Sequence, residues 1–134
     1  MQVQPYLIFN GRCAEAIEFY KKAVDAQILF QMQYKDAPDQ AHVPPGSGEK
    51  MMHVSFKIGE SVLMAADGQE DAPAAMEGCS LSISVETTTD ADRVFQALAA
   101  GGTITMPLTK TFWSEAFGML VDKFGISWMI NVEH

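Results

Sequence analysis

Apolar residues recur at helical spacing in two segments of the chain. The stripe in the first segment consists of Cys13, Ala16, Ile17, Tyr20 and Val24. The stripe in the second segment consists of Ala91, Val94, Phe95 and Leu98. Spacings of three and four residues predict one amphipathic helix from Asn10 to about Val24 and another from Thr89 to Ala100. Asn10 is the expected N-cap of the first helix, and Thr88 or Thr89 that of the second.

Short runs of alternating or continuous apolar residues predict four strands in each half of the chain. The strands of the first half are expected at 3–9, 28–34, 51–58 and 61–66. The strands of the second half are expected at 79–85, 103–109, 117–121 and 126–132. Each half therefore reads strand, helix, strand, strand, strand, which is an internal repeat of one supersecondary unit.

Two polar segments interrupt these elements. Residues 35–50 contain three prolines and two glycines and predict an exposed loop, whose length is typical of a functional or mobile segment. Residues 67–78 form a polar linker between the repeats. Neither repeat alone can bury the apolar face of its sheet. We therefore expect one domain, with repeat 1 at about 1–66 and repeat 2 at about 79–134.

Alternate residues of a strand point to opposite faces of its sheet, so parity assigns the expected faces. Apolar residues such as Phe56, Ile83 and Trp128 are expected to pack under the helices. The opposite faces combine small polar residues with methionine: His53, Ser55, Ser80, Ser82 and Met129. If the sheets curl, these residues line a concave surface with the character of a small-molecule site. The alternative is that they face water, as one side of an antiparallel sheet commonly does.

Composition narrows the class of protein. Of the 134 residues, 48% are hydrophobic and 19% charged, which is ordinary for a globular domain with its own core. The net charge of −8 argues against a nucleic-acid partner, because phosphate binding requires clustered lysine and arginine. No apolar run has the length of a membrane span or the form of a signal peptide. The two cysteines, Cys13 and Cys79, lie in predicted regular elements and make no disulfide framework, so we expect a cytoplasmic protein.

Three segments carry a family resemblance that covers nearly the whole chain in order. They read PYLIFNGRCAEAIEFYKKAV, MMHVSFKIGESVLMAADG and FGMLVDKFGISWMINV. Together they resemble the PhnB-like branch of the vicinal oxygen chelate superfamily, which also holds glyoxalase I, bleomycin-resistance proteins and extradiol dioxygenases. The resemblance implies an α+β fold in which two paired βαβββ modules form a cupped, mostly antiparallel sheet with helices outside. It also implies a homodimer.

Metal-dependent members of that superfamily hold one divalent ion with four histidine, glutamate or glutamine side chains from four strands. The resemblance places those positions on Pro5, Met64, Ser80 and Met129, or on Gln4 in place of Pro5 with a one-residue slip. None of the four aligned residues is a competent ligand for a hard divalent ion, because a thioether is a soft donor. We therefore predict no cofactor and no metal-dependent isomerase or dioxygenase chemistry at these positions. A divalent metal at a displaced site stays open as the alternative.

Ten residues make up the expected ligand-binding cup: Phe9, His53, Ser55, Met64, Asp67, Ser80, Ser82, Trp113, Phe117 and Met129. His53 is the only histidine within a predicted strand or helix and is the candidate acid or base, with a structural histidine as the alternative. Asp67 lies near the expected rim, where it either binds a polar ligand group or forms a turn with Gly68. His42 in the long loop either closes over a ligand or is solvated.

Three functions are consistent with these residues. The first is a small-molecule-binding protein that lacks the family metal site. The second is a lyase or isomerase that acts on a small organic substrate with a displaced divalent metal or with His53 as acid or base. The third is a structural or interaction subunit. Some members of the branch carry a methyltransferase label, but a nucleotide-type cofactor site needs a Gly-rich turn between strand and helix, and FNGRCAE has one glycine.

Overall fold

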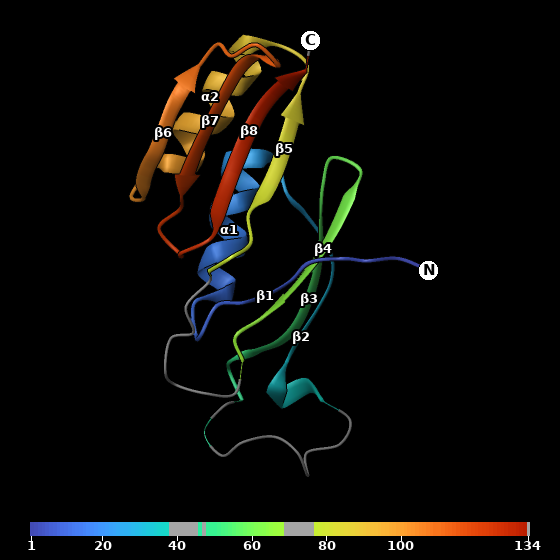
Figure 1. Cartoon of the computed structure of the whole chain (residues 1–134). Helices are drawn as coiled ribbons and strands as arrows, with labels where there is room; N and C mark the ends of the chain where they lie inside the picture. The colour runs from blue at the N-terminus through green and yellow to red at the C-terminus, as the bar shows by residue number, and fades with distance from the viewer. Residues whose placement is uncertain (38–45, 47, 69–76, 134) are drawn as a thin grey trace. The chain divides into compact units, whose positions relative to one another are not determined.

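The protein is described by a computed structural model that covers residues 1–37, 46, 48–68 and 77–133. Its residues divide into two compact units, Met1–Ala74 and Ala75–His134 (Figure 1). Each unit has its own helix and four-stranded sheet, and each is described separately below. No helix in the described ranges is long and apolar enough to cross a membrane.

Unit 1 is a βαβββ module. Its elements are β1 (Tyr6–Ile8), α1 (Cys13–Val24), β2 (Gln27–Gln33), the short 3₁₀ helix η1 (Tyr34–Asp36), β3 (Met51–Ile58) and β4 (Ser61–Ala66). The strand order in the sheet is β1-β4-β3-β2. The first strand pairs in parallel with the last, and the other neighbours are antiparallel.

Unit 2 repeats this arrangement. Its elements are β5 (Leu81–Val85), α2 (Thr88–Ala99), β6 (Thr103–Thr109), β7 (Ser114–Val121) and β8 (Ser127–Glu133). The strand order is β5-β8-β7-β6, again with a parallel pair of first and last strands. The predicted α+β class and the repeated strand–helix–strand–strand–strand order are therefore confirmed. Each of the two sheets is mixed, with one parallel and two antiparallel pairings.

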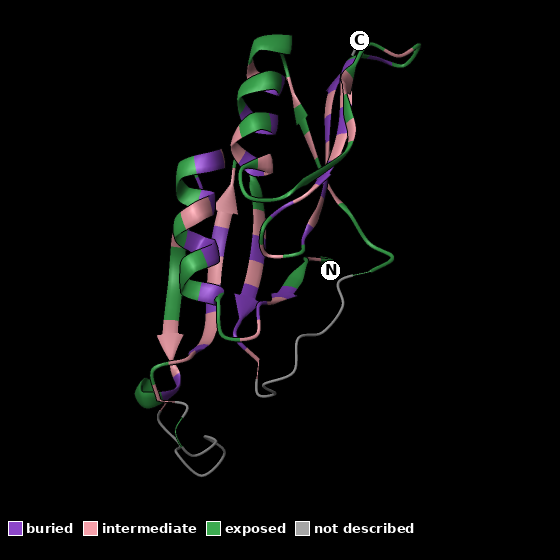
Figure 2. Ribbon diagram, turned by 90° about the vertical axis from the view of Figure 1, so that its left-hand side faces the viewer, coloured by how far each residue is buried: buried purple, intermediate pink, exposed green. Residues whose placement is uncertain are grey.

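The apolar stripes predicted from the sequence form the cores of the two units. In unit 1, Tyr20 of α1 is fully buried and stacks on Phe56 of β3, with the ring centroids 6.4 Å apart. In unit 2, Phe95 of α2 packs on β7 at Gly118, where a Cβ atom would lie 2.7 Å from the Phe95 ring. The buried residues of both helices lie on one side and the exposed residues on the other (Figure 2).

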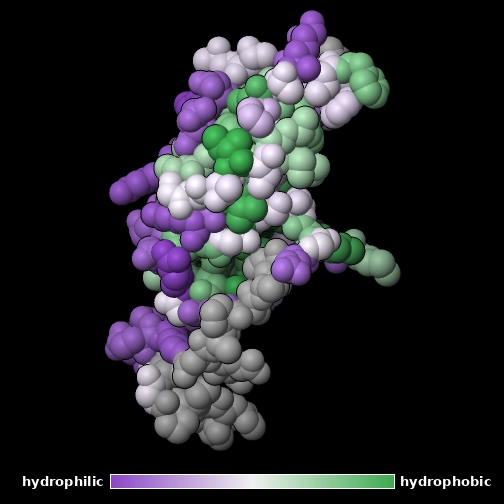
Figure 3. Space-filling view, turned by 60° about the vertical axis from the view of Figure 1, so that its left-hand side comes forward, coloured by the Kyte–Doolittle hydropathy of each residue, from purple (hydrophilic) through white to green (hydrophobic). Residues whose placement is uncertain are grey.

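The outward sides of the helices are hydrophilic. Exposed ion pairs join Glu18 to Lys21 on α1 and Asp90 to Arg93 on α2. Hydrophilic side chains of this kind gather on the surface in Figure 3. Exposed pairs at this spacing contribute only about 0.3–0.5 kcal/mol each, so burial of the apolar stripes carries the stability of the helices.

The two helix starts differ from the sequence predictions. Helix α1 begins at Cys13 rather than Asn10, because Asn10 and Gly11 both have positive φ and form the turn that precedes the helix. The first turn is closed by the Asp67 carboxylate, which accepts the Cys13 backbone N–H at 2.7 Å. In α2, Thr87 rather than Thr88 or Thr89 is the N-cap, and its hydroxyl accepts the Asp90 N–H at 3.1 Å.

Strand boundaries shift in ways that matter for the site. β1 begins at Tyr6, after Pro5, which has no N–H for the ladder but accepts the Met64 N–H through its carbonyl. β5 begins at Leu81, so Cys79 precedes the strand and is exposed rather than packed in a core as predicted. β7 begins three residues earlier than predicted, because the buried Ser114 hydroxyl donates to the Val132 carbonyl of β8 at 2.6 Å.

Candidate functional site

The face of the unit 1 sheet opposite α1 carries polar and aromatic side chains. One row runs in register across all four strands: Tyr6, Met64, Ser55 and Phe30. Phe30 is 51% exposed and Tyr6 is 45% exposed, so the row has aromatic residues at both ends and open surface around them. We call this surface the unit 1 open face. It contains the predicted site residues His53, Ser55 and Met64.

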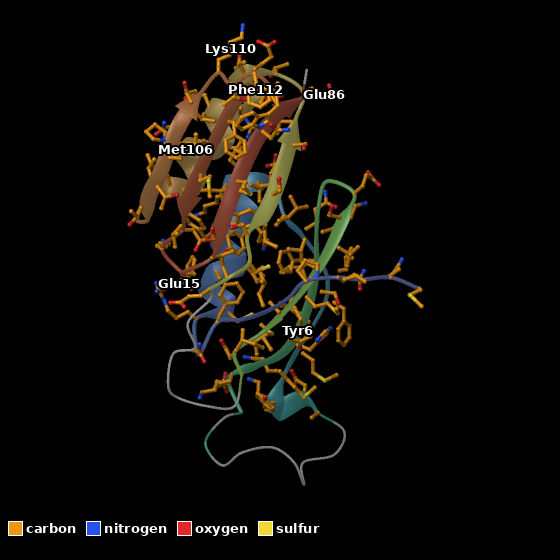
Figure 4. All side chains as sticks on the ribbon, in the orientation of Figure 1. Tyr6, Glu15, Glu86, Met106, Lys110 and Phe112 are labelled. Atoms are coloured by element: carbon orange, nitrogen blue, oxygen red, sulfur yellow. The ribbon has the colours of Figure 1, made fainter. Side chains whose placement is uncertain are left out.

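His53 lies at the centre of a hydrogen-bond chain on this face. Its Nδ1 is 3.0 Å from the Tyr6 hydroxyl, and its Nε2 is 3.2 Å from the Ser55 hydroxyl. The Tyr6 and Phe30 rings lie 5.6 and 6.2 Å from the imidazole, measured between centroids. Figure 4 shows where Tyr6 lies in unit 1. The chain orients both ring nitrogens, which is what a catalytic or ligand-binding imidazole requires.

Donor strength fixes the direction of the hydrogen bonds. A phenol is a better donor than an aliphatic hydroxyl, so the Tyr6 O–H donates to Nδ1 of neutral His53. Nε2–H then donates to the Ser55 oxygen, and the Ser55 hydroxyl proton is available to a ligand. Partial burial, followed by the nearby Cys13 and Tyr34 groups, raises the pKa of Tyr6 above its ordinary value, so the phenol keeps its proton at neutral pH.

The equivalent row in unit 2 is richer in methionine. Across β5, β8, β7 and β6 it consists of Ser82, Met129, Met119 and Met106. Met129 occupies in β8 the same place in the strand order that Met64 occupies in β4. Thioethers are polarisable and adapt their shape, so this row offers a soft surface for an apolar ligand. We call this side of the sheet the unit 2 open face.

Aromatic side chains gather at the end of this face where β7 begins. The Trp113 ring is 5.5 Å from Phe117 and 4.7 Å from Phe112, both edge to face. Phe112 is 93% exposed and Trp113 is 47% exposed. Figure 4 shows Phe112 at the same end of unit 2 as Lys110 and Glu86. We call Phe112, Trp113 and Phe117 the aromatic cluster.

Next to the aromatic cluster lies a polar atom with no partner. Asn131 stands opposite Phe117 of β7 and in register with Ser84 of β5, so all three share the open face. The Asn131 Oδ1 atom is buried, and no described group donates a hydrogen bond to it. An unsatisfied buried acceptor costs about 1–3 kcal/mol. A cost of this size calls for an explanation in terms of ligand or function.

The four positions that the family resemblance assigns to metal ligands do not fit a hard divalent ion. Pro5 has no side-chain donor, and Met64 and Met129 offer only thioether sulfur. The Ser80 hydroxyl lies 2.7 Å from the Ser127 hydroxyl and is occupied by that bond. Within residues 1–37, 46, 48–68 and 77–133, no three side chains from histidine, cysteine, aspartate and glutamate cluster to hold a metal.

Two predicted cup residues have structural roles in unit 1. Phe9 is buried and packs beside Tyr20, with the ring centroids 6.2 Å apart. Asp67 is also buried, and its second oxygen accepts the Met51 N–H at 2.7 Å. Since both oxygens of Asp67 are bound to the backbone, we leave Phe9 and Asp67 out of the proposed site. His42 lies outside the described residues.

Several residues of the open faces were not among the predicted site residues: Tyr6, Phe30, Met106, Phe112, Met119 and Asn131. Parity alone places Asn131 and Met119 on the same face as Met129, so a stricter use of the alternation rule finds them. Tyr6 and Phe30 gain their relevance from pairing with strands far along the chain, and no local pattern reveals that. Phe112 lies in a connection, where parity gives no information.

Known proteins resemble the chain over almost its whole length. Residues 1–131 match the family model described as 3-demethylubiquinone-9 3-methyltransferase. Protein YjdN of Escherichia coli K12 is 34% identical over 140 residues, which are 98% of this chain and 95% of that protein. Both the family model and this relative span both units.

Solved structures agree with these matches. Protein PA1353 from Pseudomonas aeruginosa has a TM-score of 0.89 at 40% identity, over 99% of this chain and 98% of that one. A PhnB protein from Bacillus cereus, described as a putative 3-demethylubiquinone-9 3-methyltransferase, has a TM-score of 0.80 at 29% identity, over 98% and 99%. A glyoxylase/bleomycin resistance protein/dioxygenase domain from Frankia sp. EAN1pec, 18% identical over 100% and 93% with a TM-score of 0.67, shares the fold.

Proposed function

The chain belongs to the family described as 3-demethylubiquinone-9 3-methyltransferase, the PhnB-like branch of the vicinal oxygen chelate superfamily, and on this premise we propose that it binds a small organic molecule without the family metal. The proposed ligand surface is the open faces of the two sheets. Of the residues predicted from the sequence it keeps His53, Ser55, Met64, Ser80, Ser82, Trp113, Phe117 and Met129.

One observation carries the proposal. In both sheets the same row across four strands combines soft or aromatic side chains with one hydroxyl: Ser55 in unit 1 and Ser82 in unit 2. Small-molecule sites are mostly apolar and use a few placed polar groups to orient the ligand. The donor set at Pro5, Met64, Ser80 and Met129 gives no support to metal-assisted chemistry at those positions.

The family description does not extend here to methyl transfer. A nucleotide-type cofactor binds where a strand leads through a Gly-rich turn into a helix in a mostly parallel sheet. In this chain β1 leads into α1 through a turn that contains Gly11 alone, and both sheets are mixed. Binding of a small molecule on the open faces therefore agrees better with the fold than a methyltransferase activity does.

Retention of metabolites tests the proposal. The protein is incubated with a small-molecule extract of bacterial cells, separated from free compounds by gel filtration, denatured and analysed by mass spectrometry. We expect the wild type to retain a compound, and Met64→Glu or Met129→Glu to lose it, because a carboxylate placed in either soft row has to be desolvated. Ala14→Glu, on the exposed side of α1, is the matched control and should retain the compound.

Two results contradict the binding proposal. One is that the wild type retains no more of any compound than an unrelated protein does. The other is that all variants, including the two with a glutamate in a methionine row, retain the same compound equally.

A second function, a lyase or isomerase, is favoured by the hydrogen-bond chain of Tyr6, His53 and Ser55. An imidazole held between two hydroxyls can take a proton from one carbon or oxygen of a substrate and return it to another. The test is exchange of substrate hydrogen for deuterium when the retained compound is kept with the protein in D₂O. Catalysis requires exchange with wild type and none with His53→Ala at equal retention; no exchange with wild type contradicts it.

Assembly and location are part of the same proposal. The family resemblance implies a homodimer, and the absence of a disulfide framework favours the cytoplasm. Sedimentation equilibrium gives the mass of the assembly directly. A monomer at the concentration at which a ligand is retained would contradict the dimer without affecting the binding surface within each unit.

A further inference from the structure

We propose that the unit 2 open face binds a planar aromatic compound that carries an N–H or O–H donor. In this complex the ring stacks on the aromatic cluster and the donor bonds to Asn131 Oδ1. The inference rests on the proposed binding function and narrows it to one unit, one end of one sheet and one class of ligand.

The buried amide oxygen of Asn131 defines the polar half of the site. β8 is an interior strand of its sheet, so the backbone of Asn131 is held on both sides, by Phe117 of β7 and Ser84 of β5. No described group donates to Oδ1, although buried amide oxygens in folded proteins nearly always accept a hydrogen bond. A bound donor would satisfy it, and a carboxylate or phosphate would not, because these ligands are acceptors at neutral pH.

The aromatic cluster defines the apolar half of the site. Phe117 lies directly opposite Asn131, and Trp113 contacts Phe117 edge to face at 5.5 Å. Phe112 and Trp113 expose 93% and 47% of their surface, which is unfavourable unless a partner covers them. Rings exposed beside a buried acceptor are complementary to a flat ring with a donor on its edge.

The cluster is held in place by the structure beneath it. The Ser114 hydroxyl donates to the carbonyls of Val132 and Ala116 at 2.6 and 2.8 Å, which fixes the first residue of β7 on β8. The Thr111 N–H bonds to the Ser114 carbonyl at 3.0 Å, and the Trp113 N–H bonds to the Thr111 hydroxyl at 3.3 Å. The turn that carries Phe112 and Trp113 is therefore ordered before any ligand binds, which lowers the entropic cost of binding.

A matched pair of ligands isolates the proposed hydrogen bond. Benzimidazole is planar and carries one N–H donor, and 1-methylbenzimidazole has the same ring without that donor. Dissociation constants for both are measured by ¹⁵N–¹H NMR titration of the full chain, following the Trp113 indole N–H and the Asn131 side-chain NH₂ signals. The same titrations are made with Asn131→Leu, which removes the acceptor and keeps side-chain size, and with Ser127→Ala, a control on the same face.

The expected result is an interaction between the two changes. N-methylation should weaken binding to the wild type and to Ser127→Ala by about fivefold, the usual effect of one neutral hydrogen bond. It should change binding to Asn131→Leu by less than about twofold, because the acceptor is already gone. Trp113→Ala should weaken both ligands alike, by about fivefold or more, because stacking does not depend on the donor.

Three results would overturn the inference, and they separate it from the proposed function. Equal effects of N-methylation in the wild type and Asn131→Leu would show that Oδ1 is not the acceptor. Ligand-induced shifts confined to His53 and Met64 would leave binding on the unit 1 open face intact and remove the unit 2 site. A change of molecular mass in Asn131→Leu or Trp113→Ala on sedimentation, without any ligand effect, would assign this face to contact with a second copy.

Discussion

The Asp67 carboxylate closes the first turn of helix α1 from a position 54 residues along the chain from Cys13. One oxygen accepts the Cys13 N–H and the other accepts the Met51 N–H, each at 2.7 Å. A single buried side chain thus joins the end of β4 to the start of α1 and the start of β3. An acidic group is also the favourable charge for a helix N-terminus.

Replacement of this carboxylate is expected to destabilise unit 1. Asp67→Asn puts an NH₂ group against a backbone N–H, so one charge-assisted hydrogen bond is lost, at a cost of about 2–3 kcal/mol. Urea denaturation followed by circular dichroism measures the change. Asp92→Asn, at an exposed position of α2, is the control and should stay within about 0.5 kcal/mol of the wild type. A midpoint for Asp67→Asn equal to that of the control would refute the structural role.

The two thiols are expected to react at very different rates. Cys13 is fully buried, and burial together with the Asp67 carboxylate raises its pKa to about 12, whereas Cys79 is exposed. The thiolate is the reactive form, so Ellman's reagent at pH 8 should label one thiol per native chain and two in urea. Cys79→Ala should remove the fast reaction. Fast labelling of two thiols in the native wild type would contradict the burial of Cys13.

Stability should fall at alkaline pH. The pKa of Cys13 is raised from 9.0 to about 12 in the fold, so ionisation favours the unfolded chain. Its contribution is complete below about pH 9 and is lost as the pH rises towards 12, with a slope of up to about 1.4 kcal/mol per pH unit. Burial also raises the pKa of Tyr6, which adds to the loss above pH 10.

Urea midpoints between pH 8 and 11 measure this slope. Cys13→Ala should flatten it above pH 9, and Cys79→Ala should leave it unchanged. A slope that is the same in all three proteins would exclude Cys13 as its source.

Gly118 is required by the packing of α2 on β7. A Cβ atom at this position would lie 2.7 Å from the Phe95 ring and 3.1 Å from Leu108. Gly118→Ala should therefore destabilise the protein by about 1–3 kcal/mol through overpacking. Gly48→Ala, whose Cβ would meet only Lys35 at an ordinary 3.5 Å, is the matched control. Thermal unfolding compares the two, and equal transition temperatures would contradict close helix–sheet packing at Gly118.

The tautomer of His53 should depend on Tyr6. If the phenol donates to Nδ1, the neutral imidazole carries its proton on Nε2, and ¹⁵N NMR of the ring distinguishes the two nitrogens. Tyr6→Phe removes this donor and should give a mixture of tautomers, while the exposed-site control Ser61→Ala should keep the wild-type spectrum. An Nδ1–H tautomer in the wild type would reverse the direction assigned to the hydrogen-bond chain.

Periodic features were predictable from the sequence, and contacts between distant residues were not. Tyr20 and Phe95 were placed in the cores because their stripes follow helical spacing. Asn10 was expected to cap α1 because capping rules consider only neighbouring residues, and the actual cap, Asp67, arrives with β4. Parity placed Met129 on the open face, where it lies in register with Ser82.

The candidate site shows the same division. The sequence predicted that His53 faces away from the core, but the hydroxyls of Tyr6 and Ser55 that orient it come from β1 and β3. Which side chains meet across a sheet depends on strand order and bulges, such as the register shift between Ile28 and Phe30 that places Phe30 beside Ser55. The unpaired oxygen of Asn131 depends on packing in three dimensions and leaves no pattern along the chain.

The pairing of the first strand of each unit with its last strand has a consequence for protein synthesis. β4 and β8 are the last strands of their units in sequence, yet each is an interior strand of its sheet. On the ribosome, β1 and β5 therefore emerge well before the neighbour they pair with exists. Unit 1 can complete its sheet once β4 has left the exit tunnel, while unit 2 is still being translated, so the two halves form in succession.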